Sequence, residues 1–171
     1  MRRKGLATLA AASVLAAAVI HGPARADDRG EIVVSHLQTV KKDFPGIPVP
    51  MPLADISYNP ASCTTPSPYC DRISLKVNLP EHPEDARAYV TLDWQGTQAS
   101  ALNYCILYLW DDPETTGPIK DASCEDNKAV IDFLPLKRDY QLVVRNFTAT
   151  SGEGYTLTVN YKNFEGEPGK L

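Results

Sequence analysis

The chain has 171 residues, of which 43% are hydrophobic and 22% are charged, and its formal net charge is −4. This length is that of one domain and is sufficient to bury a sizeable core. The acidic balance argues against nucleic acid and anionic lipid as partners, because both are bound by basic patches.

Residues 1–26 have the three parts of a secretory signal peptide. Positions 2–4 are basic, positions 5–20 are apolar, and the small-residue motif Ala-Arg-Ala ends at Ala26. The apolar stretch is shorter than the ~20 residues that cross a bilayer, so we expect no membrane span. Cleavage after Ala26 would leave a chain with 13 basic and 21 acidic side chains. We expect this mature chain to be secreted.

Residues 27–70 form an N-terminal segment that precedes the region of regular alternation. Within it, residues 31–42 carry apolar side chains at a spacing that fits either a strand or a short helix. Residues 45–68 contain seven prolines. Each proline removes a donor from a strand ladder, so this part predicts an extended, Pro-rich arm.

Residues 71–162 are expected to form an all-β domain. Apolar and polar side chains alternate there with the period of two that strands with one buried face require. Six short strands without an amphipathic helix predict an antiparallel two-sheet β-sandwich, similar to a jelly roll, followed by a flexible tail over 163–171. We expect the strands at residues 73–79, 88–94, 103–110, 130–134, 140–147 and 155–161.

For three large aromatic residues we predict whether the ring is buried or exposed. Trp94 and Tyr140 continue the inward-facing registers of their strands and should lie in the core. Trp110 ends its strand beside an acidic turn, so we expect an exposed ring that can contact a ligand.

The four cysteines, Cys63, Cys70, Cys105 and Cys124, all follow the expected cleavage point. An oxidising compartment makes disulfides their default state. Three pairings are open, and we favour Cys63 with Cys70 and Cys105 with Cys124. The first pair closes a short Pro-rich loop, and the second ties a strand to the connection that follows it. Zinc sites need closely spaced ligand pairs, which these intervals lack.

Acidic residues gather in the long loop that we expect from residue 111 to about residue 128. Calcium takes about six to eight oxygen ligands, so these side chains could hold one ion if they converge. The alternative is a solvated acidic loop, because the spacing is not that of an EF-hand. No other cofactor is expected. The residues concerned are Asp111, Asp112, Glu114, Asp121, Glu125 and Asp126.

Catalysis is not expected. A Ser/His/Asp or Cys/His set requires a histidine, and the mature chain offers His36 and His82 without a Gly-x-Ser-x-Gly motif. The loop over 63–70 resembles the small disulfide-closed loops with which some protease inhibitors occupy active sites. A rigid loop binds well because little entropy remains to be lost. Its other interpretation is a structural staple.

Four passages carry a resemblance to a known family: YVTLDW at 89–94, NYCILYL at 103–109 followed by Asp-Asp-Pro, DYQLVVRN at 139–146, and GYTLTV at 154–159. In this order they resemble the bacterial pre-peptidase C-terminal domain, over about residues 87–161. That family usually has two aspartates in the second passage, where this chain has Asn103 and Cys105.

The resemblance implies a β-sandwich accessory module without catalytic activity. In some relatives such a module binds collagen-like or polysaccharide material, and in some it carries calcium. With the Ala-rich signal peptide, the resemblance also implies a bacterial source. We therefore expect a secreted binding or surface-associated module with an extracellular protein or polysaccharide as its partner. The alternatives are a secreted protease inhibitor that uses the 63–70 loop and, behind it, a small hydrolase.

Overall fold

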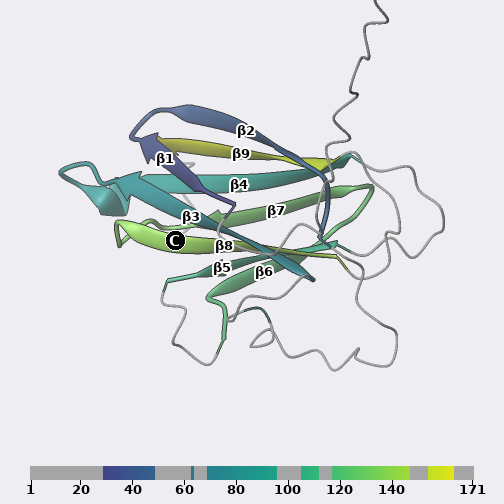
Figure 1. Cartoon of the computed structure of the whole chain (residues 1–171). Coiled ribbons are helices and arrows are strands. Elements are labelled where there is room, and N and C mark those ends of the chain that lie inside the picture. Colours follow the sequence, from purple (N-terminus) through teal and green to yellow (C-terminus); the bar gives the residue numbers. More distant parts are fainter. Residues whose placement is uncertain are drawn as a thin grey trace, which may run out of the picture.

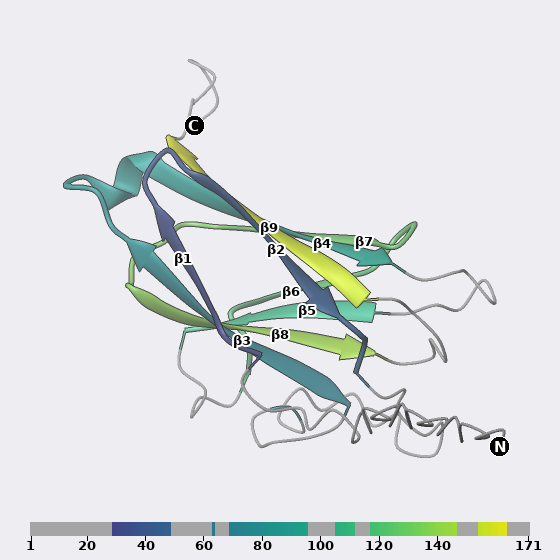
Figure 2. The same ribbon diagram turned by 45° about the horizontal axis from the view of Figure 1, so that its top comes forward.

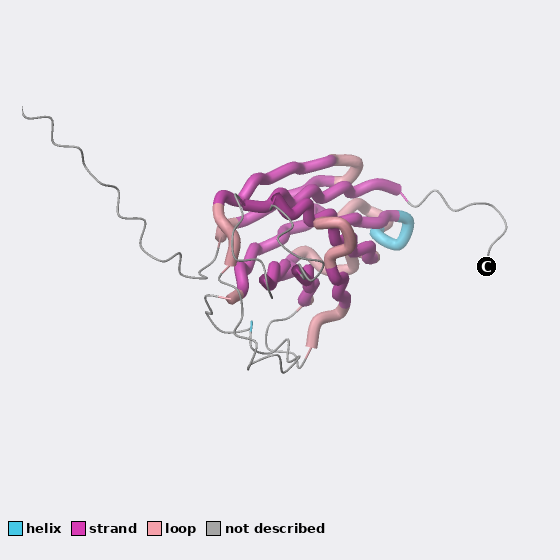
Figure 3. The backbone as a smooth tube through the Cα atoms, turned by 90° about the vertical axis from the view of Figure 1, so that its right-hand side faces the viewer, coloured by secondary structure: helices cyan, strands magenta, loops and turns pink. Residues whose placement is uncertain are grey.

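The structure is a computed structural model that describes residues 29–48, 63, 69–95, 105–111, 117–146 and 154–163. Strands dominate these ranges, with one short 3-10 turn, η3 (Pro83–Asp85), before β4 (Figure 3). Among these residues no helix is long and apolar enough to cross a membrane. The strands are β1 (Glu31–Ser35), β2 (Thr39–Pro45), β3 (Cys70–Asn78), β4 (Ala86–Gln95), β5 (Cys105–Trp110), β6 (Lys120–Ser123), β7 (Lys128–Phe133), β8 (Asp139–Asn146) and β9 (Gly154–Asn163).

The strands form two layers, as Figure 1 shows. The five-stranded sheet has the order β1-β3-β8-β5-β6, and the four-stranded sheet has the order β2-β9-β4-β7. This arrangement confirms the expected all-β two-sheet sandwich. One pairing differs from the expected antiparallel pattern, because β1 runs parallel to β3. The chain passes from β1 in one sheet directly to β2 in the other, so β1 obtains its neighbour from a later part of the chain (Figure 2).

Residues 31–42, which the sequence left open between strand and helix, lie in β1, β2 and the turn between them. Ile32 and Val34 point into the core, but Val33 between them is 45% exposed. Because Ile32, Val33 and Val34 are all apolar, the sequence does not show that only the first and third side chains are buried. Because β1 and β2 each complete a sheet, the sandwich begins before Asp71, where the sequence placed its start.

The strand β6 lies inside the region that we expected to be a loop from residue 111 to about residue 128. It pairs with β5, with Leu107 opposite Ala122. Only Ala122 of its four side chains is partly buried, and the other three are exposed. The segment therefore lacks the alternation of apolar residues that announces a strand.

The main core fills the space between the sheets. Trp94 and Tyr140 both belong to it, as their registers predicted. The rings of Phe44, Tyr155 and Trp94 stack side by side across three neighbouring strands of the four-stranded sheet, with centroid distances of 5.0 and 5.9 Å. Such aromatic contacts add to the free energy gained from burying the rings.

A second apolar cluster, which we call the outer cluster, lies on the outer face of the five-stranded sheet. Trp110 belongs to it and is only 1% exposed, so the prediction of an exposed Trp110 that contacts a ligand is wrong. The acidic neighbour misled that prediction, whereas the apolar character of both faces of 105–110 was the better guide. The cluster consists of Cys63, Cys70, Ile106, Tyr108, Trp110 and Val143, with Tyr69 partly buried against it.

Both favoured disulfides are present. Cys63 and Cys70 have Cα atoms 5.7 Å apart, and Cys105 and Cys124 have Cα atoms 5.2 Å apart. The first bridge lies in the outer cluster. The second joins the start of β5 to the end of β6. Most of the Pro-rich arm lies outside the described residues, as does the predicted signal peptide. The predicted tail over 163–171 also lies outside them except for Asn163, which ends β9.

Candidate functional site

The acidic residues proposed for calcium separate into several places. Asp111 follows β5 and accepts a hydrogen bond from Lys137 Nζ at 2.7 Å. Asp121 belongs to β6, while Glu125 and Asp126 lie in the turn between β6 and β7. Within the described residues, no group of three or more side chains of metal-ligand type comes together. Asp112 and Glu114 lie outside those residues, so calcium binding stays a prediction.

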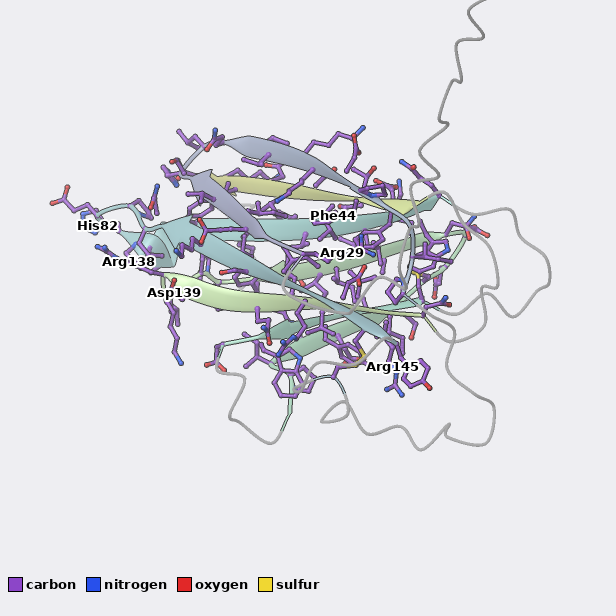
Figure 4. All side chains as sticks on the ribbon, viewed as in Figure 1. Arg29, Phe44, His82, Arg138, Asp139 and Arg145 are labelled. Carbon is purple, nitrogen blue, oxygen red and sulfur yellow. A yellow bond between two sulfur atoms is a disulfide. The ribbon has the colours of Figure 1, made fainter. Side chains whose placement is uncertain are left out.

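His36 and His82 lie at the same end of the sandwich, because Ser35 at the end of β1 is paired with Asn78 at the end of β3. His82 precedes η3, and its Nδ1 lies 3.3 Å from Glu84 Oε1, with both side chains exposed. The ring of His36, in the turn between β1 and β2, packs edge-on against Tyr161 with centroids 5.2 Å apart. Figure 4 shows His82 beside Arg138 and Asp139 at this end. These contacts hold the ring of His36 against the core and pair His82 with a surface carboxylate.

A buried polar group joins the two sheets at the opposite end. Asp71 in β3 is only 2% exposed, and its Oδ2 forms an ion pair with Arg29 Nε at 3.0 Å and receives a hydrogen bond from Tyr155 Oη at 2.9 Å. Arg29 also donates from Nη1 to the Pro45 carbonyl oxygen at 2.8 Å. Figure 4 shows Arg29 close to Phe44, between the layers.

Burial affects the protonation of both Asp71 and Tyr155. Desolvation raises the pKa of Asp71, and the Arg29 guanidinium and the hydrogen bond from Tyr155 oppose that rise. Desolvation, together with the neighbouring Asp71 carboxylate, raises the pKa of Tyr155 far above its ordinary value. Tyr155 therefore stays protonated and donates its hydrogen bond. The group holds β3, β9 and the segment before β1 together.

The sequence contained a signal for Asp71 that our prediction missed. Asp71 has the same inward parity as Ile73 and Leu75 in β3. A carboxylate at an inward position needs a partner, because an unpaired buried charge costs several kcal/mol, on the order of its desolvation energy. That partner, Arg29, precedes β1 and could not be identified without the topology.

The outer face of the four-stranded sheet is polar, and several of its charged side chains form ion pairs of opposite charge. Lys128 Nζ lies 3.3 Å from Asp93 Oδ1, and Arg87 forms an ion pair with Asp132. Lys162 Nζ lies 5.1 Å from the ring centroid of Tyr89. Between these pairs the face carries the side chains of Thr39, Lys41, Asp43, Thr91, Thr156, Thr158 and Asn160.

An open depression of about 720 Å³ lies at the edge where β6 and β7 meet. Its walls come from the end of β6, from the following turn and from the first half of β7. Asp126 and Asn127 in that turn have positive φ angles of 48° and 63°, which shape a two-residue connection between Glu125 and Lys128. The lining residues are Ala122, Ser123, Glu125, Asp126, Lys128 and Val130.

The 63–70 loop is described only at Cys63, Tyr69 and Cys70. The two sulfur-bearing side chains are buried in the outer cluster. This placement favours the staple interpretation for the bridge. Residues 64–68, which an inhibitor would present, lie outside the described residues, so the inhibitor hypothesis stays a prediction.

Comparison with known proteins finds similarity at the level of structure. No protein-family model and no curated protein sequence matches the chain. The pre-peptidase C-terminal domain of collagenase from Bacillus anthracis aligns over 78% of this chain and 96% of that domain, with 12% identity and a TM-score of 0.44. It is the type of domain that the sequence resembles.

A second solved structure is the CUB1-EGF-CUB2 domain of human MASP-1/3, with 10% identity and a TM-score of 0.36. The alignment covers 78% of this chain and 42% of that structure.

Proposed function

We propose that this chain is a secreted, non-catalytic binding module for an extracellular protein or polysaccharide. The observation that carries the proposal is the open depression at the β6/β7 edge, which continues onto the polar outer face of the four-stranded sheet. Open surfaces lined by short polar and charged side chains suit recognition of a polymer, whereas catalytic sites are usually concave and largely enclosed.

The positions of the reactive side chains also support binding over hydrolysis. His82 lies beyond the end of β3, and Ser123 in the depression ends β6 at the opposite end of the sandwich. A general base must lie within hydrogen-bonding reach of its nucleophile, so these two cannot act as a pair. The buried carboxylate of Asp71 is enclosed by Arg29 and Tyr155 and serves the packing of the sheets.

The test is a binding assay on the immobilised mature chain, residues 27–171. It uses two sets of defined ligands, insoluble polysaccharides and extracellular proteins, with a heat-unfolded sample as the control. We expect saturable retention of one ligand class by the folded chain alone. Equal retention by folded and unfolded chain, or hydrolysis that disappears in His82→Ala, would contradict the proposal.

The inhibitor alternative is separated by one further variant. Replacing residues 64–68 with Gly and Ser, while keeping Cys63 and Cys70, should leave ligand binding unchanged. The same variant should lose all activity against trypsin-, chymotrypsin- and subtilisin-like enzymes if the chain is an inhibitor.

A further inference from the structure

The two sheets differ in their number of strands, and the difference falls at one edge. The five-stranded sheet ends in β6, and the four-stranded sheet ends in β7. Ala122 of β6 points inward beside Leu107 of β5; Leu107 is fully buried, and Ala122 is partly buried at the rim of the main core. Within the described residues, β7 is the strand of the other sheet that lies nearest to β6, and no backbone ladder joins the two strands. The depression occupies this position, next to Val130.

The free edge of β7 offers backbone hydrogen-bonding groups to that space. The Trp94 amide donates to the Asn127 carbonyl oxygen at 2.8 Å, and this contact fixes which residues of β7 turn toward β4. In an antiparallel pair the direction alternates, so Ala129 and Ile131 bond to β4, while Val130 and Asp132 turn outward. The Val130 side chain is 50% exposed. Four backbone groups, one N–H and one C=O from each of these two residues, thus point away from the sheet.

Among the described residues, backbone hydrogen bonds close this edge at one point. Lys128 also turns outward, but it exchanges two backbone hydrogen bonds with Glu125, at 2.8 and 2.9 Å. This contact ends the open edge beside the turn. Farther along, Lys120 Nζ of β6 lies 3.9 Å from Asp132 Oδ1, and both side chains are about half exposed. Exposed ion pairs of this kind contribute little free energy and yield readily.

The opposite edge of the sandwich is held more firmly. Lys42, at an inward position of β2, donates from Nζ to the Glu31 carbonyl oxygen of β1 at 3.0 Å. Arg29 donates to the Pro45 carbonyl oxygen close by, where β1 begins and β2 ends. Inward-pointing charged side chains on an edge strand are a recognised protection against pairing with another chain. On the β1/β2 edge Lys42 gives this protection, whereas the β6/β7 edge leaves Val130 accessible.

We propose that an extended segment of a partner protein adds to β7 as a fifth strand of the four-stranded sheet. The added strand would pair with Val130 and Asp132 and would lie above Ala122, which completes a five-on-five sandwich. This mode of recognition takes its affinity from backbone hydrogen bonds and its specificity from alternate side chains. The proposal rests on the binding role proposed above and selects protein as the ligand class.

The charges and the size of the depression restrict the sequence of the partner segment. The residue opposite Ile131 points inward over Ala122 and is therefore a small or medium apolar side chain. Glu125 and Asp126 stand exposed at the turn end of the depression, so a basic side chain at that end of the segment is complementary. Because Glu125 occupies the edge at Lys128, the added strand is short and lies opposite residues 129–133.

The experiment uses two blocked peptides, Lys-Thr-Val-Thr-Val-Thr and its reverse, added to the 15N-labelled mature chain. We expect the Val130 and Asp132 amides to exchange rapidly in the free protein and to become protected when a peptide binds. The Ala129 and Ile131 amides, which already bond to β4, should be protected in both states. N-methylation of alternate peptide residues should abolish binding for one set of positions and be tolerated for the other set.

A variant that fills the space provides the protein-side test. Ala122→Trp should weaken peptide binding by about tenfold or more, comparable to the loss of one or two hydrogen bonds. Val33→Trp, on the exposed outer side of the opposite edge, is the matched control and should leave the affinity unchanged. The melting temperature of each variant checks that the sandwich is intact.

Three results would overturn the inference. The first is that neither peptide binds at concentrations up to about 1 mM, a free energy near −4 kcal/mol. The second is slow exchange of Val130 and Asp132 in the free protein, which would mean that the chain itself covers the edge. The third is binding that leaves these amides and the Ala122→Trp affinity unaffected. If the third result accompanies saturable retention of a natural ligand, the proposed function stands and strand addition alone is wrong.

Discussion

Asp71 places a carboxylate in an interior that is otherwise largely apolar, and its two partners come from distant parts of the chain. Arg29 precedes β1, and Tyr155 lies in β9. Replacing a buried pair by apolar groups can be neutral, but removing one member leaves an uncompensated charge. The stability of the sandwich should therefore respond more to the loss of Arg29 than its position outside the strands suggests.

Arg29→Ala should lower the free energy of unfolding by about 3 kcal/mol, because it leaves Asp71 buried with Tyr155 as its remaining partner. Urea unfolding followed by tryptophan fluorescence measures the change. The double variant Arg29→Ala/Asp71→Asn should recover part of the loss, since the uncompensated charge is then absent. Lys76→Ala, which breaks the exposed pair with Glu31, is the control and should have little effect. Equal losses for Arg29→Ala and Lys76→Ala would contradict this account.

The pH dependence of stability should carry the signature of Asp71. Its pKa is raised by desolvation above the ordinary value of 3.8, so the folded state binds this proton more tightly than the unfolded state. The contribution of Asp71 to stability is therefore greatest at acid pH and declines as pH rises from about 4 through the raised pKa. Thermal unfolding of the wild type and Asp71→Asn across this interval tests the sign. Subtracting the two profiles should give a difference that falls with increasing pH.

At the scale of elements, the close approach of β2 and β9 depends on one glycine. Gly154 has φ of +146°, and a Cβ atom there would lie 2.2 Å from the Phe44 carbonyl oxygen. Gly46 nearby also has a positive φ, of +76°, but a Cβ atom there would have no neighbour within 4 Å. Comparing substitutions at Gly154 and Gly46 therefore distinguishes the cost of steric overlap from the cost of backbone strain.

Gly154→Ala should destabilise the protein by about 3 kcal/mol, because β2 must move away from β9. Gly46→Ala should cost about 1 kcal/mol, the strain of the left-handed conformation alone. Chemical denaturation of both variants gives the comparison. Similar losses at the two positions would show that β2 adjusts freely.

The disulfide between Cys105 and Cys124 fastens the edge strand β6 to β5. Because β6 buries little apolar surface, we expect the double variant Cys105→Ala/Cys124→Ala to lose about 3 kcal/mol and to lose protection first in β6. Hydrogen exchange should show faster exchange over residues 120–123 than over β3. Uniform acceleration across both sheets would indicate that the bridge stabilises the whole sandwich instead.

Elements with one buried face were predictable, and elements at the edges were not. The alternation predicted β3, β4 and β9 together with their inward residues. The strands predicted at 130–134 and 140–147 correspond to β7 and β8 within two residues at each end. β6 gave no signal, because only Ala122 of its four side chains is partly buried and the other three are exposed. In β1 the exposed Val33 interrupted the pattern. The interpretation of Trp110 failed because a neighbouring acidic turn was given more weight than the apolar residues on both sides of its strand.

At the scale of the whole molecule, the alternation of apolar and polar residues could predict two sheets, but it could not predict which strands belong to each sheet. The favoured disulfides followed from spacing alone, while the parallel pairing of β1 with β3 and the position of Arg29 depend on topology. The depression at the β6/β7 edge depends on topology as well. It exists because one sheet has a strand more than the other, and that difference is invisible until every strand has been assigned to its sheet.

The order of pairing in the four-stranded sheet has a consequence for synthesis. Its central strand β9, which lies between β2 and β4, is the last to leave the ribosome. Until residues 154–163 emerge, β2 has no neighbour and β4 has only β7 beside it. The first and last strands of this layer therefore meet only after residues 154–163 have emerged, and a nascent chain cut short before residue 154 would display apolar strands that a chaperone has to shield.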